Sequence, residues 1–271
     1  MAKQIAKIEE NDRGQLSGAL ARGLAVLDVI LDTPQSLTLA EIAQRARLDL
    51  STTMRLLRTL EESRYVLRID NGKRYAGSPR ATMPLPVLHP IKQFRREVFP
   101  TLTELSIAVK ATVVLVAFLE AERIVIEIAQ VAGSLAPYYR TWLNGPLHGS
   151  GSGKALLATF PEERREALLG PGPYRAVTQY SITDPARLRE DLEKGTRQGY
   201  YVARDEHIVG LTAISANIPT WRGGAVGCFV MTAHSRDCTD KHTAFAGEQL
   251  HRAAELIRHQ AHSISAFSLS R

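Results

Sequence analysis

The sequence predicts an α+β protein of two domains: a winged helix-turn-helix at the N-terminus and a larger domain built on an antiparallel sheet. Its 271 residues exceed one small domain, and a hydrophobic share of 44% is enough for two cores. Helical apolar spacing and then a hairpin signal fill the first part, whereas β-rich runs alternate with helical segments in the rest. We therefore divide the chain into residues 1–80, a linker helix over 81–99 and a second domain over 100–271.

Two helices are predicted at the start of the first domain. In the segment 17–30, apolar residues recur at helical spacing and share one face: Leu20, Leu24, Leu27 and Ile30. The run Thr38–Glu41 has the pattern of a capping box, in which the threonine and glutamate side chains satisfy free amides at a helix start. It predicts a second helix that ends near Ala46.

A third helix is predicted after Ser51, which is a good N-cap residue. Apolar residues at helical spacing define its buried face: Met54, Leu57 and Leu60. Polar and basic residues define the opposite face, which is suited to contact another molecule: Thr52, Thr53, Arg55 and Arg58.

A hairpin is predicted to follow the third helix. Residues 65–69 and 74–76 form two β-rich runs, and the turn Asp70-Asn71-Gly72-Lys73 separates them. The Asn-Gly pair supplies the two positive φ values that a tight hairpin needs. Three helices and a two-stranded wing make a winged helix-turn-helix, whose third helix is sized to enter a DNA major groove.

The charge distribution agrees with this order of elements. Between Arg45 and Arg80 there are nine basic residues against four acidic ones, within a chain whose net charge is +6. Basic side chains on the third helix and wing can neutralise phosphates, while threonines and Arg55 near the helix start can reach base edges. Two alternatives stay open: a basic but merely solvated helical domain, and a winged helix that contacts only proteins.

Composition bounds the cellular setting. No apolar stretch approaches the roughly 18 residues of a membrane span, and the N-terminal residues lack the apolar core of a secretion signal, so we expect a cytoplasmic protein without a membrane partner. The two cysteines, Cys228 and Cys238, are too few and too late in the chain for a disulfide framework or a zinc ribbon. We expect both to be free thiols.

The second domain is predicted to mix strands and helices. Pro90 can open a connecting helix through Val98, and Pro100 a further helix to about Lys110. A hairpin is expected from residues 112–119 and 124–131. The further strands expected are 138–142, 200–203, 211–218 and 225–232. The further helices expected are 153–160, 161–169, 185–198 and 243–267.

Over nearly its whole length, the chain resembles the IclR family of transcriptional regulators. The stretches that carry the resemblance are Ala21–Leu24 with Leu50–Leu57, Pro146–Ala158 and Gly199–Ala216. The resemblance implies a GAF- or profilin-like effector-binding domain, a double-stranded DNA operator as partner, and a homodimer or tetramer. Together with the charge pattern, it nominates these residues for DNA contact: Arg22, Ser51, Thr52, Thr53, Arg55, Arg58, Lys73 and Arg74.

The glycine-rich loop Gly149–Lys154 invites two enzymatic interpretations, and both fail. A Walker A loop needs glycine at His148 and serine or threonine at Ala155, and a hydrolase elbow needs glycine two residues to either side of its serine. What remains is a glycine loop that leads into a helix N-terminus, whose free amides suit a carboxylate. Close packing of the loop on the sheet is an equally good explanation of the glycines.

The family pattern implies an effector pocket, and its residues are Pro137, Gly145, Gly151, Ser152, Ala203, Leu211, Ala213, Val230 and Thr232. Ala203 and Val230 stand where relatives that bind small acids look more polar, which favours a bulkier organic acid. Tyr138, Tyr139 and Trp142 lie nearby in the sequence and favour an aromatic one.

Three further functions were weighed. His242, His251, His259 and His262 near the last helix lack the cysteines or acidic cluster of a metal site, so we expect neither metal nor cofactor. An enzyme acting on a small carboxylate would draw on Ser150, Ser152, His148 and Glu206, although no recognised catalytic spacing joins them. A nonspecific, chromatin-like binder would show no preference among duplexes. We favour a regulator, most simply a repressor, whose effector shifts the spacing of paired DNA-binding heads.

Overall fold

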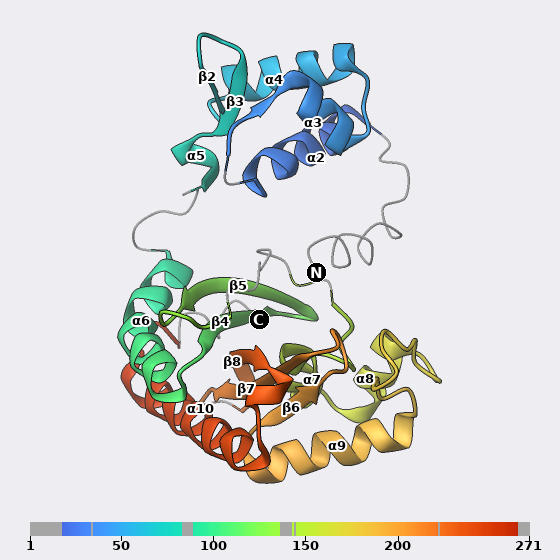
Figure 1. Cartoon of the computed structure of the whole chain (residues 1–271), viewed down its shortest axis with the longest axis vertical. Coiled ribbons are helices and arrows are strands. Elements are labelled where there is room, and N and C mark those ends of the chain that lie inside the picture. Colours follow the sequence, from blue (N-terminus) through green and yellow to red (C-terminus); the bar gives the residue numbers. More distant parts are fainter. Residues whose placement is uncertain are drawn as a thin grey trace. The chain divides into compact units, whose positions relative to one another are not determined.

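The computed structural model describes residues 18–33, 35–82, 89–135, 143, 145–221 and 223–264. The chain divides into two compact units, Met1–Pro86 and Val87–Arg271, each of which is described by itself (Figure 1). Pro137 and the strand predicted over residues 138–142 lie outside the described residues.

In the described part of the N-terminal unit, helices pack against a small antiparallel sheet (Figure 1). Its helices are α2 (Ala19–Leu31), α3 (Leu39–Ala46), α4 (Leu50–Glu62) and α5 (Pro79–Thr82). Its strands are β1 (Leu37–Thr38), β2 (Val66–Ile69) and β3 (Arg74–Gly77), in the order β1-β3-β2. The sheet therefore has one strand more than the predicted two-stranded wing, because β1 pairs with β3.

Local capping explains where the helices of this unit begin. The capping box of α3 is confirmed: Glu41 N donates to Thr38 Oγ1 at 3.3 Å, and Thr38 N donates to Glu41 Oε2 at 2.7 Å. The predicted N-cap of α4 is wrong by two residues, since Asp49 caps the helix and accepts from Thr52 N at 2.7 Å. Ser51 is therefore an exposed residue of the first turn.

The buried face of α2 also differs from the prediction. Leu20 is 78% exposed and Leu24 is 52% exposed, whereas Ala25, Val26 and Ile30 enter the core. The buried face of the helix is thus rotated from the predicted one, because apolar spacing alone does not determine which face packs against the core. In the hairpin, Asp70, Asn71 and Gly72 all have positive φ, so the turn has three such residues and not the two that were predicted.

The C-terminal unit is built on a five-stranded antiparallel sheet in the order β5-β4-β8-β7-β6, which confirms the predicted α+β class (Figure 1). The strands are β4 (Thr112–Leu119), β5 (Glu122–Ala129), β6 (Tyr201–Arg204), β7 (Leu211–Pro219) and β8 (Ala225–His234). The helices are α6 (Pro90–Val109), α7 (Gly151–Leu157), α8 (Glu162–Leu169), α9 (Pro185–Gln198) and α10 (Asp240–Gln260).

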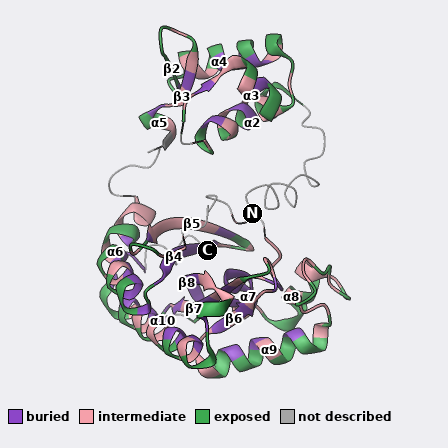
Figure 2. Cartoon of the chain, viewed as in Figure 1, coloured by how far each residue is buried: buried purple, intermediate pink, exposed green. Residues whose placement is uncertain are grey.

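Buried residues lie on both faces of this sheet, while most of β5 is partly buried (Figure 2). Alternate residues of β4 divide between two cores: Val113, Leu115 and Ala117 pack with α6 and α10, while Val114 and Val116 belong to the core beneath α7. The alternation places Arg123 of β5, which pairs with Phe118, on the α7 face.

The structure has one helix, α6, where the sequence predicted two that meet at Pro100. Pro100 lies inside this helix, although proline removes one backbone hydrogen bond and disfavours a helix interior. Phe94, Val98 and Leu102, before and after it, are fully buried, so one continuous helix keeps all of them in the core.

Candidate nucleic-acid interface and ligand site

The exposed face of α4 presents the side chains expected of a DNA-reading helix. Ser51, Arg55 and Arg58 are exposed, and Thr52 is half-buried. Arg58 forms a surface ion pair with Glu62 at 3.1 Å. In the described residues, the Arg55 guanidinium has no hydrogen bond or ion pair, so it is available to an incoming partner.

Thr53 was predicted to face DNA, and that prediction is wrong. Its side chain is fully buried, and its hydroxyl donates to the Asp49 carbonyl oxygen at 2.8 Å. Thr53 is three and four residues before Leu56 and Leu57, which are also buried, and the 3.6-residue helical period puts all three on one face. Met54, predicted to be buried, is 41% exposed for the same reason.

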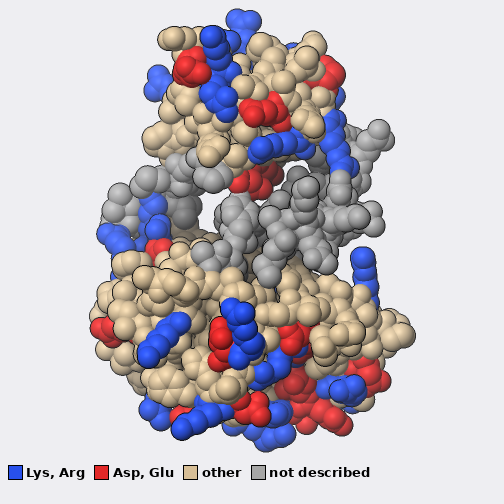
Figure 3. Space-filling model, viewed as in Figure 1, with Lys and Arg blue, Asp and Glu red and all other residues tan. Residues whose placement is uncertain are grey.

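The wing contributes basic side chains of unequal availability. Lys73 is exposed at the turn. Arg74 is half-buried: its Nε donates to Ser36 Oγ at 3.0 Å, and its guanidinium lies 3.6 Å from the Glu41 carboxylate. It therefore ties β3 to the segment before β1. In Figure 3, lysine and arginine side chains project from the surface of the N-terminal unit, and acidic side chains are interspersed among them.

Two further basic residues of this unit, Arg22 and Arg68, are partly engaged by the protein. Arg22 of α2 donates from Nε to the Gly18 carbonyl oxygen at 3.3 Å. Arg68 lies over the Tyr75 ring at 5.7 Å and donates to the Gly72 carbonyl oxygen at 2.8 Å. Sequence reasoning did not nominate Arg68 as a contact residue, although its position in the hairpin beside the turn was a usable signal.

In the C-terminal unit, glycines bring the start of α7 close to its surroundings. A Cβ atom at Gly153 would lie 2.2 Å from the Leu147 carbonyl oxygen, and one at Gly151 would lie 3.0 Å from the Ala213 Cβ. Close packing against backbone therefore requires glycine at position 153, whereas position 151 is only tight against a side chain. Because α7 has only seven residues, its macrodipole is weak, and an anion bound at this place needs another source of positive charge.

The structure brings most of the predicted effector residues to one face of the sheet. Ala203, Ala213 and Thr232 are in register across β6, β7 and β8, and Gly151 lies over Ala213. Val230 lies in the next row on the same face, opposite Ser215. Leu211 is at the start of β7, and Gly145 lies beside the His207 ring.

Arg123 is the residue at this place that sequence reasoning missed. It is 3% exposed, and its Nη1 donates to Ser150 Oγ at 2.7 Å and to Ser152 Oγ at 3.1 Å. Its Nη2 donates to the Leu143 carbonyl oxygen at 3.0 Å and to that of Gly145. Burial lowers the pKa of Arg123 to about 10, which leaves it cationic at neutral pH.

A second buried cation, Lys154, is fully neutralised. Its Nζ lies 2.8 Å from Asp191 Oδ2 and 2.6 Å from Glu206 Oε1, and it donates to the Val202 carbonyl oxygen at 2.9 Å. Burial raises the pKa of Glu206 despite the adjacent ammonium. Glu206 Oε2 is buried without a hydrogen-bond partner among the described residues.

Among the described residues, those considered for an enzymatic alternative form no hydrogen bonds with one another. His148 Nε2 lies 3.1 Å from the Arg175 carbonyl oxygen, and Ser150 Oγ donates to the Pro146 carbonyl oxygen at 2.8 Å. Glu206 is engaged by Lys154. In the part of the chain that the structure describes, these groups form no pair of a nucleophile and a base.

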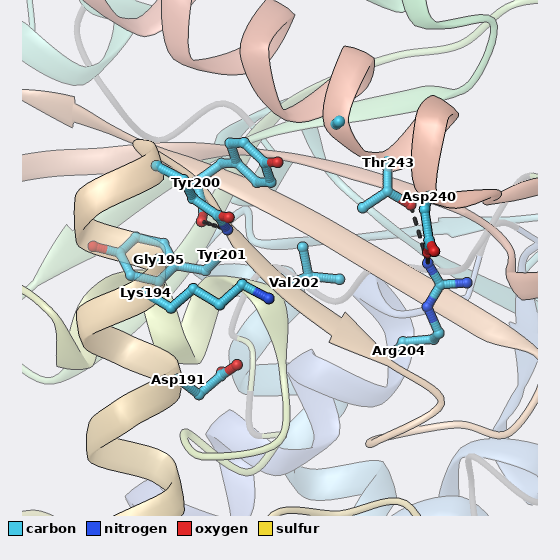
Figure 4. A pocket seen from close by; sticks show the side chains of 11 residues that line it. Asp191, Lys194, Gly195, Tyr200, Tyr201, Val202, Arg204, Asp240 and Thr243 are labelled. Atoms are coloured by element: carbon cyan, nitrogen blue, oxygen red, sulfur yellow. Dashed lines mark hydrogen bonds and ion pairs between the residues drawn. The ribbon is translucent and has the colours of Figure 1, made fainter.

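A pocket of about 320 Å³ lies elsewhere, at the β6 edge of the sheet between α9 and α10 (Figure 4). Its lining mixes polar and apolar groups: Arg204 donates to Thr243 at 3.1 Å, and Asp191 and Lys194 project from α9. None of the predicted effector residues lines this pocket.

The following findings concern the described residues only. They hold no cluster of three histidine, cysteine or acidic side chains able to bind a metal ion. No helix among them is both long and apolar enough to span a membrane. Cys228 and Cys238 are free thiols, as predicted, and both are buried.

Comparison with known proteins agrees with this architecture. Residues 19–70 match the family described as IclR helix-turn-helix domain, and residues 91–259 match the family described as bacterial transcriptional regulator IclR C-terminal. The transcriptional repressor IclR of Escherichia coli is 31% identical over 202 residues, which are 74% of this chain and 74% of that protein. The Escherichia coli repressor AllR is 28% identical over 262 residues, or 91% and 89%.

Solved structures share the fold. The Thermotoga maritima IclR structure has a TM-score of 0.72 and 24% identity, and the match covers 88% of this chain and 96% of that one. An IclR homolog from Microbacterium hydrocarbonoxydans, solved with 4-hydroxybenzoate, has a TM-score of 0.73 and 24% identity, with coverage of 92% and 100%. Both matched domains and the relatives lead to the same assignment: the chain belongs to the IclR family of transcriptional regulators.

Proposed function

We propose that this protein is a sequence-specific transcriptional repressor whose affinity for its operator changes when a small organic acid binds its C-terminal unit. The observation that carries the DNA-binding part is the exposed face of α4, where the Arg55 side chain is unengaged among the described residues. A major-groove helix needs such groups to reach base edges. Exposed Lys73 in the wing is suited to a phosphate contact.

The repressor role is supported by relatives. IclR and AllR of Escherichia coli are both described as transcriptional repressors, and each aligns with most of this chain. Family members of this kind share an N-terminal helix-turn-helix with a C-terminal domain, as this chain does. A repressor that reads a palindrome requires paired recognition helices, so the proposal includes a symmetric dimer or tetramer.

An aromatic or similarly bulky acid is the effector class that we propose. The sheet face beneath α7 offers small or apolar side chains, among them Ala203, Ala213 and Val230. A very small hydrophilic acid would leave much of such a surface unfilled. The structural neighbour solved with 4-hydroxybenzoate supports this class, since its fold matches along nearly the whole chain.

Gel shifts with the full-length chain test the proposal. The DNA is the region upstream of the protein's own gene, with a random duplex of equal length as control. We expect preferential binding to the upstream DNA and a change in that binding on addition of 4-hydroxybenzoate. Equal affinity for both duplexes contradicts sequence-specific regulation.

Calorimetric titration then tests the effector class. We expect benzoate or 4-hydroxybenzoate to bind more tightly than glyoxylate, because the aromatic ring buries more apolar surface. Tight binding of glyoxylate without measurable binding of either aromatic acid would overturn the preference for a bulky acid and leave the DNA-binding proposal intact.

A further inference from the structure

The start of α7 is flanked by two buried cations whose electrostatic situations differ. Lys154 is fully buried and lies within 2.8 Å of one carboxylate and 2.6 Å of another. Arg123, by contrast, donates only to neutral oxygens: two serine hydroxyls and two carbonyls. One cation is thus neutralised by charge, and the other is solvated by dipoles alone.

No carboxylate compensates Arg123 among the described residues that contact it. Glu122, its chain neighbour, is exposed and acts only at a distance. Cys228 is buried, and burial raises the pKa of its thiol, so it stays neutral. Burial also lowers the pKa of the nearby His207, and the Arg123 charge lowers it further. The sequence itself has no acidic residue between Glu127 and Glu162.

A buried charge without a counter-ion is costly, and an anion that enters its vicinity is stabilised more strongly than in water. The two serines define where such an anion can bind. Ser150 accepts from Arg123 and donates its own hydrogen to the Pro146 carbonyl oxygen at 2.8 Å. Ser152 also accepts from Arg123, at 3.1 Å, but its hydroxyl hydrogen has no acceptor among the described residues.

Ser152 therefore stands as a donor that Arg123 orients and polarises. Its side chain is 5% exposed and belongs to the residue that follows Gly151, which lies over Ala213 on the sheet face described above. A carboxylate oxygen that accepts from Ser152 would lie one hydroxyl group away from the guanidinium. Hydrogen bonds to ionised acceptors are stronger than those to neutral ones.

We infer that Arg123, acting through the hydroxyl of Ser152, makes the effector site selective for an anionic carboxylate over a neutral ligand of the same shape. This inference rests on the proposed effector-binding function and adds its charge-selecting residue. Because the guanidinium acts through Ser152, Arg123 is a positioning residue, and Ser152 is the group that contacts the ligand.

The test is calorimetric titration of the full-length chain with matched pairs of ligands. Benzoate, 4-hydroxybenzoate and glyoxylate are each compared with the corresponding amide, which keeps the shape and removes the charge. The readout is the ratio of acid affinity to amide affinity. For the wild type we expect a ratio of about 10 or more, the range of a charge-assisted hydrogen bond.

Four variants and one control variant locate the source of that ratio. Arg123→Met should lower it about tenfold, and Arg123→Lys, which keeps the charge, should keep most of it. Ser152→Ala should lower it as Arg123→Met does, whereas Ser150→Ala should lower it less, because the Ser150 hydrogen is already used. Arg189→Met removes an exposed arginine paired with Glu162 and controls for net charge.

The outcomes separate two failures. If the wild type binds no acid of the panel more tightly than its amide, both the effector proposal and this inference are overturned. If it prefers acids but Arg123→Met and Ser152→Ala keep that preference, only the role of Arg123 is overturned. Should Arg123→Met fail to fold, equal ratios for Ser150→Ala and Ser152→Ala overturn the inference by themselves.

Discussion

Removal of the buried ammonium of Lys154 is the strongest perturbation that the C-terminal unit offers. All three hydrogens of Nζ are used, by Asp191, Glu206 and the Val202 carbonyl oxygen, at 2.6 to 2.9 Å. In Lys154→Met, Asp191 stays partly solvated because 31% of its side chain is exposed, but Glu206 is left with 8% exposure and no cation. Breaking a buried pair in this way costs about 3–5 kcal/mol of unfolding free energy.

The stability deficit of Lys154→Met should also depend on pH, in a direction that the pKa of Glu206 sets. Burial already raises the pKa of Glu206, and loss of the ammonium raises it further. When the pKa of an acid is higher in the folded than in the unfolded state, the acid destabilises the fold increasingly as the pH rises from the unfolded-state pKa to the folded-state pKa. The deficit of Lys154→Met relative to the wild type should therefore shrink as the pH is lowered from about 7 toward 5.

Urea unfolding followed by tryptophan fluorescence reports the unfolding free energy of the C-terminal unit, which contains Lys154. Both tryptophans, Trp142 and Trp221, lie in the C-terminal unit. The exposed Lys194 provides a control: Lys194→Met should change stability by less than about 0.5 kcal/mol. The reasoning is refuted if Lys154→Met lies within about 1 kcal/mol of the wild type at neutral pH, or if its deficit grows as the pH falls.

Gly153→Ala places a Cβ 2.2 Å from a backbone oxygen and should lower the thermal unfolding midpoint, at a cost of about 1–3 kcal/mol in unfolding free energy. Gly151→Ala should have a smaller effect on that midpoint. Equal effects of the two substitutions would contradict the packing role of Gly153. Burial lowers the pKa of His148 below 6.5, so the unfolding free energy should fall as the pH drops through that value. In urea titrations, His148→Gln should show a weaker dependence of unfolding free energy on pH than the wild type. An unchanged pH dependence would contradict this prediction. Thr53→Val removes a buried hydrogen bond and should cost about 1 kcal/mol in unfolding without altering DNA specificity in gel shifts, and lost specificity would restore Thr53 as a contact.

Features encoded by neighbouring residues were predictable from the sequence. The capping box over Thr38–Glu41 needs only four residues and appears in the structure with both hydrogen bonds. The positions of β4, β7 and β8 followed from β-rich runs bounded by turns. The class of fold followed from the order of such elements.

Features that depend on tertiary packing were not predictable from the sequence. The N-cap of α4 was placed at Ser51 because serine and aspartate both cap well, and only the backbone chooses Asp49. Thr53 was placed on the polar face because threonine suits either face of a helix; its burial depends on what α4 packs against. Pro100 was expected to start a helix, but burial of Val98 and Leu102 holds one helix together across it.

Arg123 illustrates the largest gap for the site. A single arginine at the start of a β-rich run carries no local signal of function. Its four acceptors lie 20 to 29 residues later in the sequence, and the fold alone brings them to it. The sheet rows that align Ala203, Ala213 and Thr232 are likewise visible only after strand pairing is known.

The central claim is that α4 reads DNA sequence through its exposed face, and Arg55→Ala tests it most directly. Quantitative gel shifts compare this variant with the wild type on the upstream DNA and on a random duplex, with Lys73→Ala as a wing control. We predict that Arg55→Ala loses about 1–3 kcal/mol on the specific DNA and clearly less on the random duplex, while Lys73→Ala weakens both about equally. Equal loss on both duplexes for Arg55→Ala would contradict the account.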